Sequence, residues 1–159
     1  MATTKDACDL LDADHKAVKK LFTEYESLVG STAKTAQARK MEIAETICRE
    51  LSAHAQVEEE IFYPAVRSAI KDTDLLDEAE VEHASAKDLI AQIEEEMDNM
   101  DDMFDAKVKV LGEYIDHHVK EEREEMFPKA RAAKKLDLVA MRGEIESRKA
   151  ELLSEQEQS

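Results

Sequence analysis

One short pattern occurs twice in this sequence, and it restricts the chain to few folds. Each copy has a histidine, a glutamate four residues later and a proline ten residues after the histidine: His54, Glu58 and Pro64, then His118, Glu122 and Pro128. On an α-helix, positions i and i+4 lie on one face about one turn apart. Each copy therefore presents an imidazole beside a carboxylate, which is typical of a pair of metal ligands.

The composition predicts a single all-α domain. The chain has 159 residues, enough for one core without disulfides, and 38% of them are charged, with only three glycines and two prolines. Aromatic residues make up 4% and tryptophan is absent, so we expect a core of leucine, isoleucine, valine, methionine and alanine.

Apolar residues recur at helical spacing in five segments, which predict five helices. We expect helices over 4–29, from 34 to a kink or end at Pro64, over 75–97, from 104 to Pro128, and over 138–152. Four long helices with short connections predict an antiparallel up-down-up-down bundle. The last segment predicts an additional C-terminal helix that packs on it.

We expect these elements to divide the chain into a bundle at 1–133, the C-terminal helix at 134–153 and a disordered tail at 154–159. Thr3 with Asp6 predicts a capping box at the start of the first helix. The run Asp72-Thr73-Asp74 offers capping side chains for the third.

The predicted bundle places four histidines at one height. His15 and His83 lie about ten residues after the starts of their helices, and His54 and His118 lie ten before the closing prolines. Each is thus about 15 Å from the same end of the bundle. If these residues were only core histidines, Glu58 and Glu122 would be buried without partners, at a cost of several kcal/mol per charge.

The six side chains together supply four imidazole nitrogens and two carboxylates. If both glutamates bridge, each of two metal ions receives two imidazoles and two carboxylate oxygens. An oxo, hydroxo or water bridge is a fifth donor, and an octahedral ion keeps one position open for a small ligand. Mixed imidazole and carboxylate donors suit iron, manganese or zinc.

The quoted motifs resemble the hemerythrin-like, or HHE cation-binding, family over about residues 5–130. They are the lone histidine of the first helix, HAQVEEEIFYP, Glu82-His83 and HHVKEEREEMFP. The resemblance implies a non-haem centre of two iron ions (Fe²⁺/Fe³⁺) with an oxo or hydroxo bridge, which binds dioxygen or related small ligands. It also implies terminal iron ligands at His15, His54, His83 and His118, and bridging carboxylates at Glu58 and Glu122.

One departure from that family bears on function. Oxygen-carrying hemerythrins have a second histidine four residues from the first on the third helix, where this chain has Ala79 and Lys87. Glu80 is either a substitute ligand or a solvent-facing side chain. With one ligand fewer, both irons could be open, which suits reaction with peroxide or nitric oxide, or sensing, better than reversible O₂ carriage. We expect a protein that binds dioxygen or a related small ligand for storage, delivery or sensing, with an enzyme acting on peroxide or nitric oxide as the alternative. A third interpretation of the sequence is a bundle that contains zinc or no metal and serves as a protein interaction module.

Two neighbours of His118 have competing interpretations. His117 lies about 100° around the helix, so we expect solvent exposure or a contact behind the ligands. Tyr114, one turn before His118, either packs in the core or hydrogen-bonds to an oxygen species on the metal.

The charge balance, 22 basic against 38 acidic residues, gives a net charge of −16. Such a surface repels nucleic acid and anionic lipid, and no segment predicts a secretory signal or membrane span. We expect a cytoplasmic monomer or homodimer whose ligands are O₂, peroxide or NO. Cys8 and Cys48 would lie about 20 Å apart in the bundle. They are therefore predicted to be free thiols, because a disulfide needs Cα atoms within about 7 Å.

Overall fold

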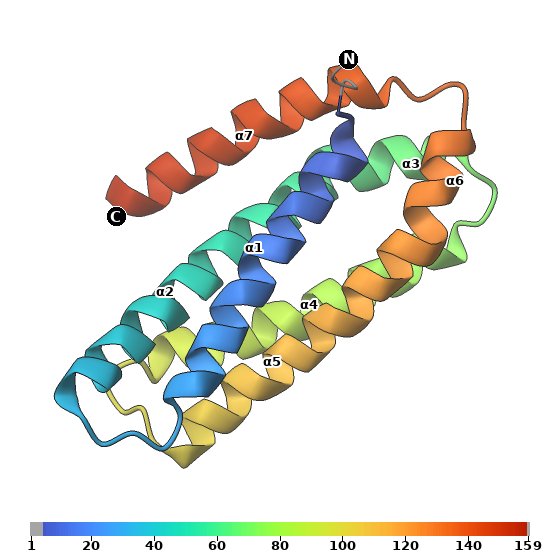
Figure 1. The fold of residues 1–159 in the computed structure, drawn as a ribbon. Helices are drawn as coiled ribbons and strands as arrows, with labels where there is room; N and C mark the ends of the chain where they lie inside the picture. Colours follow the sequence, from blue (N-terminus) through green and yellow to red (C-terminus); the bar gives the residue numbers. More distant parts are fainter. Residues whose placement is uncertain (1–4, 159) are drawn as a thin grey trace.

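The structure, a computed structural model, describes residues 5–158 as helices with short connections (Figure 1). In chain order the elements are α1 (Ala7–Leu28), α2 (Lys34–Val57), η1 (Glu58–Phe62), α3 (Tyr63–Ala69), α4 (Asp74–Glu95), α5 (Asp102–Glu121), η2 (Glu122–Met126), α6 (Phe127–Ala132) and α7 (Leu138–Gln158). The segments η1 and η2 are π-helical, and the others are α-helical.

These elements form four long rods that alternate in direction: α1, then α2–η1–α3, then α4, then α5–η2–α6 (Figure 1). Residues 5–158 contain no strand. The predicted all-α, up-down-up-down four-helix bundle with an additional C-terminal helix is confirmed. Within the same residues, no helix combines the length and apolar character needed to cross a bilayer.

The helix caps differ from those predicted. Thr3 lies outside the described residues, and α1 begins at Ala7 with Asp6 as its N-cap. The Asp9 amide donates to Asp6 at 2.9 Å and the Asp6 amide donates to Asp9 at 3.1 Å, which makes a capping box. At α4, Thr73 is the N-cap, but its side chain makes no capping hydrogen bond. Its backbone is helical rather than extended, so its hydroxyl is not directed at the first turn.

The helices that carry the repeated pattern do not end at their prolines. A π-helical turn precedes each proline, and the chain then continues as α3 to Ala69 and as α6 to Ala132. Proline has no N–H, and its ring crowds the carbonyl four residues earlier. A turn widened by one residue relieves that crowding, so the helical path continues where we expected Pro64 to kink or end it.

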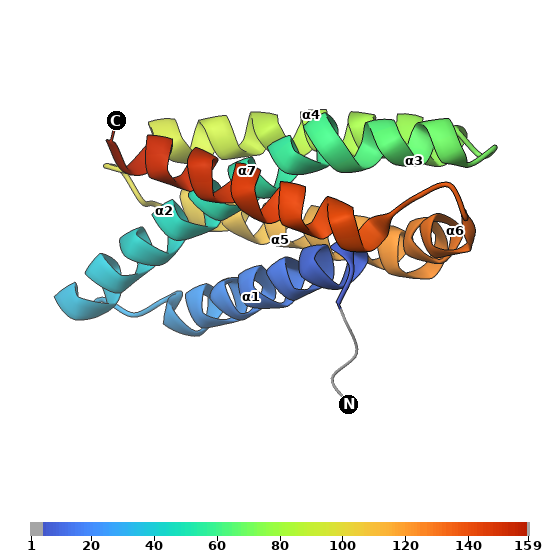
Figure 2. The ribbon, with the colours of Figure 1, turned by 90° about the horizontal axis from the view of Figure 1, so that it is seen from above.

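Helix α7 packs across α1 and α2 along one side of the bundle (Figures 1 and 2). Its inward face buries Leu138, Met141, Ile145 and Leu152, as the sequence predicted. Helix α7 continues to Gln158, into the segment 154–159 where the sequence predicts a disordered tail. This stretch consists mainly of glutamate and glutamine, which favour helix, and contains neither glycine nor proline.

The core consists of two apolar clusters at opposite ends of the bundle. One includes Leu11, Val57, Phe62, Leu76 and Ile145, and the other includes Phe22, Tyr25, Ile47, Phe104 and Leu111. Each fully buried side chain of this size contributes about 1.5–3 kcal/mol to folding. The predicted histidines and glutamates are buried and belong to neither cluster.

The two cysteines lie in different clusters, Cys8 in the first and Cys48 in the second, and both are free. The prediction that they form no internal disulfide is confirmed. Burial raises the pKa of each thiol to about 12, so neither is a reactive thiolate at neutral pH.

Candidate metal centre

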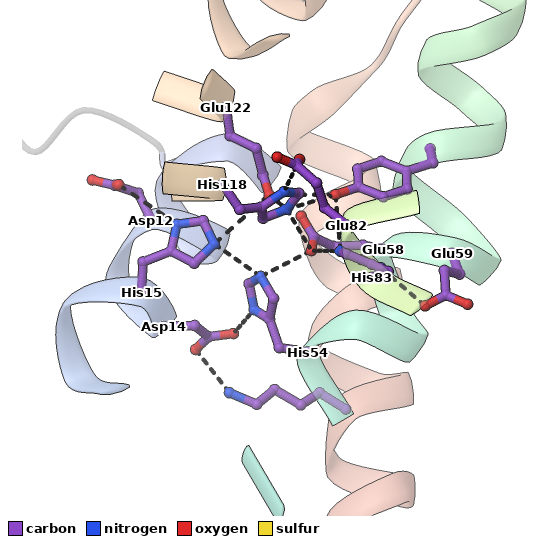
Figure 3. Close-up of polar contacts among 12 residues, drawn as sticks. Asp12, Asp14, His15, His54, Glu58, Glu59, Glu82, His83, His118 and Glu122 are labelled. Carbon is purple, nitrogen blue, oxygen red and sulfur yellow. Dashed lines mark hydrogen bonds and ion pairs between the residues drawn. The ribbon is translucent and has the colours of Figure 1, made fainter. Parts of the chain in front are cut away.

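All six side chains singled out by the sequence meet at one level of the bundle (Figure 3). They are His15 on α1, His54 on α2, Glu58 at the start of η1, His83 on α4, His118 on α5 and Glu122 at the start of η2. None is more than 7% exposed. Four separate helical rods thus contribute to one buried polar cluster.

The histidines are arranged as two pairs. Nε2 of His15 lies 3.0 Å from Nε2 of His54, and the rings of His83 and His118 have centroids 5.0 Å apart. Ligand atoms of the first pair gather within 4.8 Å with Glu58 and Glu122, and those of the second pair gather with Glu58. The cluster therefore offers two adjacent ion positions that share a carboxylate.

Both carboxylates reach across the two pairs. Glu58 Oε1 lies 3.2 Å from His54 Nε2 and 3.3 Å from His83 Nε2. Glu122 Oε1 lies 2.5 Å from His118 Nε2 and 3.9 Å from His15 Nε2. Each glutamate can thus contact both ion positions, which is the arrangement that bridging carboxylates require.

Three carboxylate oxygens in this cluster have no hydrogen-bond partner among the described residues. They are both oxygens of Glu58 and Oε2 of Glu122, and all are fully buried. A buried carboxylate left unpaired costs several kcal/mol. Cations between these oxygens and the imidazole nitrogens would satisfy all of them, so the residues present fit a metal pair.

Burial and the charges of neighbouring side chains strongly shift the pKa values in the cluster. Burial and the charge of Glu58 raise the pKa of Glu122 to about 7. Burial, together with the charge of His54, lowers the pKa of His15 to about 3, which keeps its imidazole neutral as ligation requires. Burial opposes charge on His54, but the carboxylates of Glu58, Asp14 and Glu122 together outweigh it and raise the pKa of His54 to about 10.

Three of the four imidazoles are oriented from behind by a carboxylate (Figure 3). Nδ1 of His54 lies 3.2 Å from Asp14, that of His83 lies 3.0 Å from Glu59, and that of His118 lies 3.0 Å from Glu82. A carboxylate only accepts, so each Nδ1 carries the proton and donates it. In the neutral ring that binds a metal, Nε2 is then the lone-pair atom that faces the centre, as in many histidine-metal sites.

Cations hold two of these outer carboxylates in turn. Lys87 donates to Glu59 at 2.6 Å, and Lys149, from α7, donates to Asp14 at 2.7 Å. The C-terminal helix is therefore connected to the candidate ligand His54 through a chain of two polar contacts.

A tyrosine that the sequence analysis did not single out lies at the centre. The hydroxyl of Tyr63 is 3.0 Å from His118 Nε2, 3.2 Å from His83 Nε2 and 3.3 Å from Glu122 Oε1. Burial, followed by the charge of Glu122, raises the pKa of this phenol well above its usual value, so the hydroxyl keeps its proton.

The corresponding residue in the second copy of the pattern is Phe127, which faces the other histidine pair. Its ring stacks on His15 with centroids 6.5 Å apart and an interplanar angle of 9°. One ion position is therefore beside a phenol and the other beside a phenyl ring. The two positions are chemically unequal.

The tyrosine considered from the sequence, Tyr114, is not in the core. It is 48% exposed, so the packing role is wrong. Tyr63 lies five residues after Glu58, a spacing that shares a face only where the turn is π-helical. Pro64 was the feature of the sequence that could have identified Tyr63, because it marks the position of the π-helical turn η1.

A small cavity adjoins the histidines. Its volume is about 30 Å³, and its wall includes Leu51, Ala86, Ile90 and Tyr114. A cavity of this size admits one or two molecules of the size of water and excludes larger compounds.

The remaining sequence candidates do not join the centre. Glu80 is 61% exposed and binds Arg67 at 3.2 Å, so it faces solvent. His117 is 66% exposed and contacts Glu121 at 2.8 Å. Ala79, four residues before His83, offers no ligand atom.

The fold and the buried histidine and glutamate cluster define a helical bundle with a candidate metal site. The chain belongs to the hemerythrin HHE cation binding domain family, whose sequence profile matches residues 6–130. It is also 30% identical over 119 residues to a protein of Nostoc sp. (strain PCC 7120) named DNA nickase. That similarity covers 75% of this chain and 32% of the relative, so the chain spans about a third of the relative's length. No solved structure matches the chain.

Proposed function

We propose that this protein is a non-haem di-iron protein that binds dioxygen or a related small ligand for storage, delivery or sensing. His15 and His54 would be terminal ligands of one iron, and His83 and His118 of the other. Glu58 and Glu122 would bridge the pair, with an oxo or hydroxo group as a further bridge. Iron is chosen over manganese and zinc because the family resemblance implies it.

The observation that carries this proposal is the set of buried oxygens on Glu58 and Glu122 that have no hydrogen-bond partner among the described residues. Each glutamate contacts a histidine of both pairs, so each would bind both ions. With two imidazoles and two carboxylate oxygens per ion, an octahedral iron keeps positions for small ligands. The adjoining cavity of about 30 Å³ limits those ligands to diatomic or similarly small molecules.

The second candidate function is a di-iron enzyme that acts on peroxide or nitric oxide. The Tyr63 hydroxyl favours it, because a protonated phenol beside one ion position can donate a hydrogen bond or a proton to a bound ligand. Positive charge and an open coordination position would be supplied by the iron when bound.

The activity named for the Nostoc relative is said of that protein alone. The chain spans only about a third of that protein, and a net charge of −16 repels the phosphate backbone of nucleic acid. The proposal further includes a cytoplasmic location and a monomer or homodimer.

One sample tests both candidates. The protein is purified without chelators, its metals are measured, and its ultraviolet-visible spectrum is recorded after anaerobic reduction, after exposure to O₂ and after deoxygenation. Two irons per chain with a spectrum that appears and reverses would support dioxygen binding. Two irons that oxidise irreversibly would favour peroxide or nitric oxide chemistry, and protein containing zinc or no metal would refute the di-iron proposal.

A further inference from the structure

A groove between α1 and α5 differs in charge from the rest of the molecule. It has a volume of about 600 Å³, and these two helices lie side by side (Figure 1). Five of the chain's 22 basic residues line it, against two of its 38 acidic residues. The five, which we call the basic groove residues, are Lys16, Lys19, Lys20, Lys120 and Arg123.

Part of this positive charge is not neutralised within the molecule. Lys19 pairs with Asp116 across the groove at 2.7 Å, and Lys16 approaches Asp12 at 3.5 Å. Lys20 and Lys120, one from each side, are exposed and form no ion pair within residues 5–158. Two ammonium groups without an ion-pair partner among these residues therefore line the groove, one from each side, on a protein of net charge −16.

The floor of the groove is apolar and leads to the metal centre. Phe22, Ile115 and Val119 contribute to it, and the imidazole of His15 lies among them. Nε2 of the same ring is directed into the centre, 3.0 Å from His54 Nε2. His15 therefore connects the groove to one ion position by a single side chain. Electron transfer falls steeply with distance, so this is a short route into a buried centre.

We propose that the basic groove is the docking surface for a small acidic electron-transfer protein that reduces the di-iron centre. Charge complementarity identifies the partner, since basic residues on both sides of an apolar floor suit carboxylates around an apolar redox edge. Lys16 and Lys19 are 69% and 59% exposed, so they project toward a partner surface rather than enclose a small anion. At physiological salt, charges more than about 8 Å apart are largely screened from each other. An acidic partner close to the groove is therefore attracted by the basic groove residues more strongly than it is repelled by the acidic residues elsewhere on the surface.

The redox step is a one-electron transfer. At each docking event the partner loses one electron and one ferric ion becomes ferrous, so two events return a diferric centre to the diferrous state. The inference thus rests on the proposed function. Its test also needs a measurement that does not depend on iron.

Binding of the full chain to an acidic plant-type [2Fe–2S] ferredoxin is measured by calorimetry at 50 mM and 300 mM salt. We expect weak binding at 50 mM that weakens about tenfold at 300 mM. The double variant Lys20→Gln/Lys120→Gln should weaken binding at least fivefold. The control Lys34→Gln/Lys71→Gln removes the same charge from exposed lysines outside the groove and should change it less than twofold.

Stopped-flow reduction of the air-oxidised protein supplies the redox measurement. Reduced ferredoxin should reduce the iron of the groove variant several-fold more slowly than the iron of the control variant. Dithionite, which needs no docking surface, should reduce both variants at the same rate. The docking surface would be overturned by any of three results: the two double variants weaken ferredoxin binding equally, the protein does not bind ferredoxin, or it binds inorganic phosphate as tightly as ferredoxin. If the purified protein contained no iron and still bound ferredoxin in a way that depends on Lys20 and Lys120, the docking surface would stand. Only its electron-transfer role would be overturned, together with the proposed di-iron function on which that role rests.

Discussion

The Tyr63 hydroxyl lies 3.0 Å from Nε2 of His118, within the cluster that would hold the metal ions. The equivalent position in the second copy of the pattern is Phe127, beside His15. The repeat therefore supplies equivalent histidines and glutamates to both ion positions, but a proton donor to only one.

Replacing Tyr63 by phenylalanine should preserve the metal content, because the four histidines and two glutamates remain. The rate at which peroxide oxidises the diferrous protein should fall about 10²-fold if the phenol donates a proton. Rapid-mixing spectroscopy measures this rate. The matched control is Tyr114→Phe, which removes a hydroxyl from a tyrosine 48% exposed at the edge of the adjoining cavity. Equal rates in the two variants would refute a role for Tyr63.

Glu122→Gln should reduce the metal content from two ions to one or fewer per chain. A neutral amide cannot supply the anionic bridge, and the second position would keep only Glu58. Glu125→Gln is the control, because Glu125 is exposed and three residues away on the same rod. Metal analysis after equal reconstitution with ferrous iron decides the outcome, and two ions retained in Glu122→Gln would contradict the bridging assignment.

The stability of the metal-free protein should depend on the protonation of Glu122. Burial and the charge of Glu58 raise its pKa from 4.5 to about 7, so between these values the folded chain holds a proton that the unfolded chain has released. Its contribution to the free energy of unfolding therefore falls as pH rises from 4.5 to 7. Urea unfolding of wild type and Glu122→Gln across this range isolates the contribution, and parallel curves would disprove it.

Lys149→Met should weaken metal binding about tenfold, because loss of a group that orients a ligand typically costs 10–100-fold in affinity. The lysine holds Asp14, which holds His54 in the orientation that directs Nε2 at the centre. Competition with a chelator measures the affinity. Lys149→Arg should largely restore it, and Lys135→Met, an exposed lysine just before α7, should leave it unchanged.

Lys40 is a buried charged residue away from the candidate metal centre, beside the apolar cluster that includes Tyr25 and Phe104. Lys40 is 2% exposed, and its ammonium lies 2.9 Å from Asp105, which also accepts a hydrogen bond from Tyr25 at 2.6 Å. Asp105→Ala would leave this charge unpaired and should lower the free energy of unfolding by about 3–5 kcal/mol. Lys40→Met should cost less, since Asp105 is 16% exposed to water and keeps the hydrogen bond from Tyr25. Urea unfolding of both variants measures the difference, and equal losses would contradict it.

The fold and the six candidate ligands could be predicted because both depend on regular helical spacing. His54 and Glu58 share a face by the four-residue rule, and the position of each histidine along its helix sets its height. The outer carboxylates could not be predicted, since Asp14 and Glu82 reach histidines on neighbouring helices and their pairing depends on how those helices pack.

Tyr63 was missed for a different reason. The sequence was read with an α-helical period throughout, and that period turns Tyr63 away from Glu58. The π-helical turn before Pro64 brings them onto one side. Lys40 was missed because a lone lysine is ordinarily exposed, and only its proximity to Asp105 makes its burial tolerable.

The two apolar clusters have a consequence for how the molecule holds together. A layer of six ionisable side chains separates them, so the interior is two adjoining cores with an electrostatic boundary between them. Without positive charge at that boundary, the two ends of the bundle should open to solvent as separate units. Two bound metal ions, with ligands from all four helical rods, would make the two ends of the bundle unfold together.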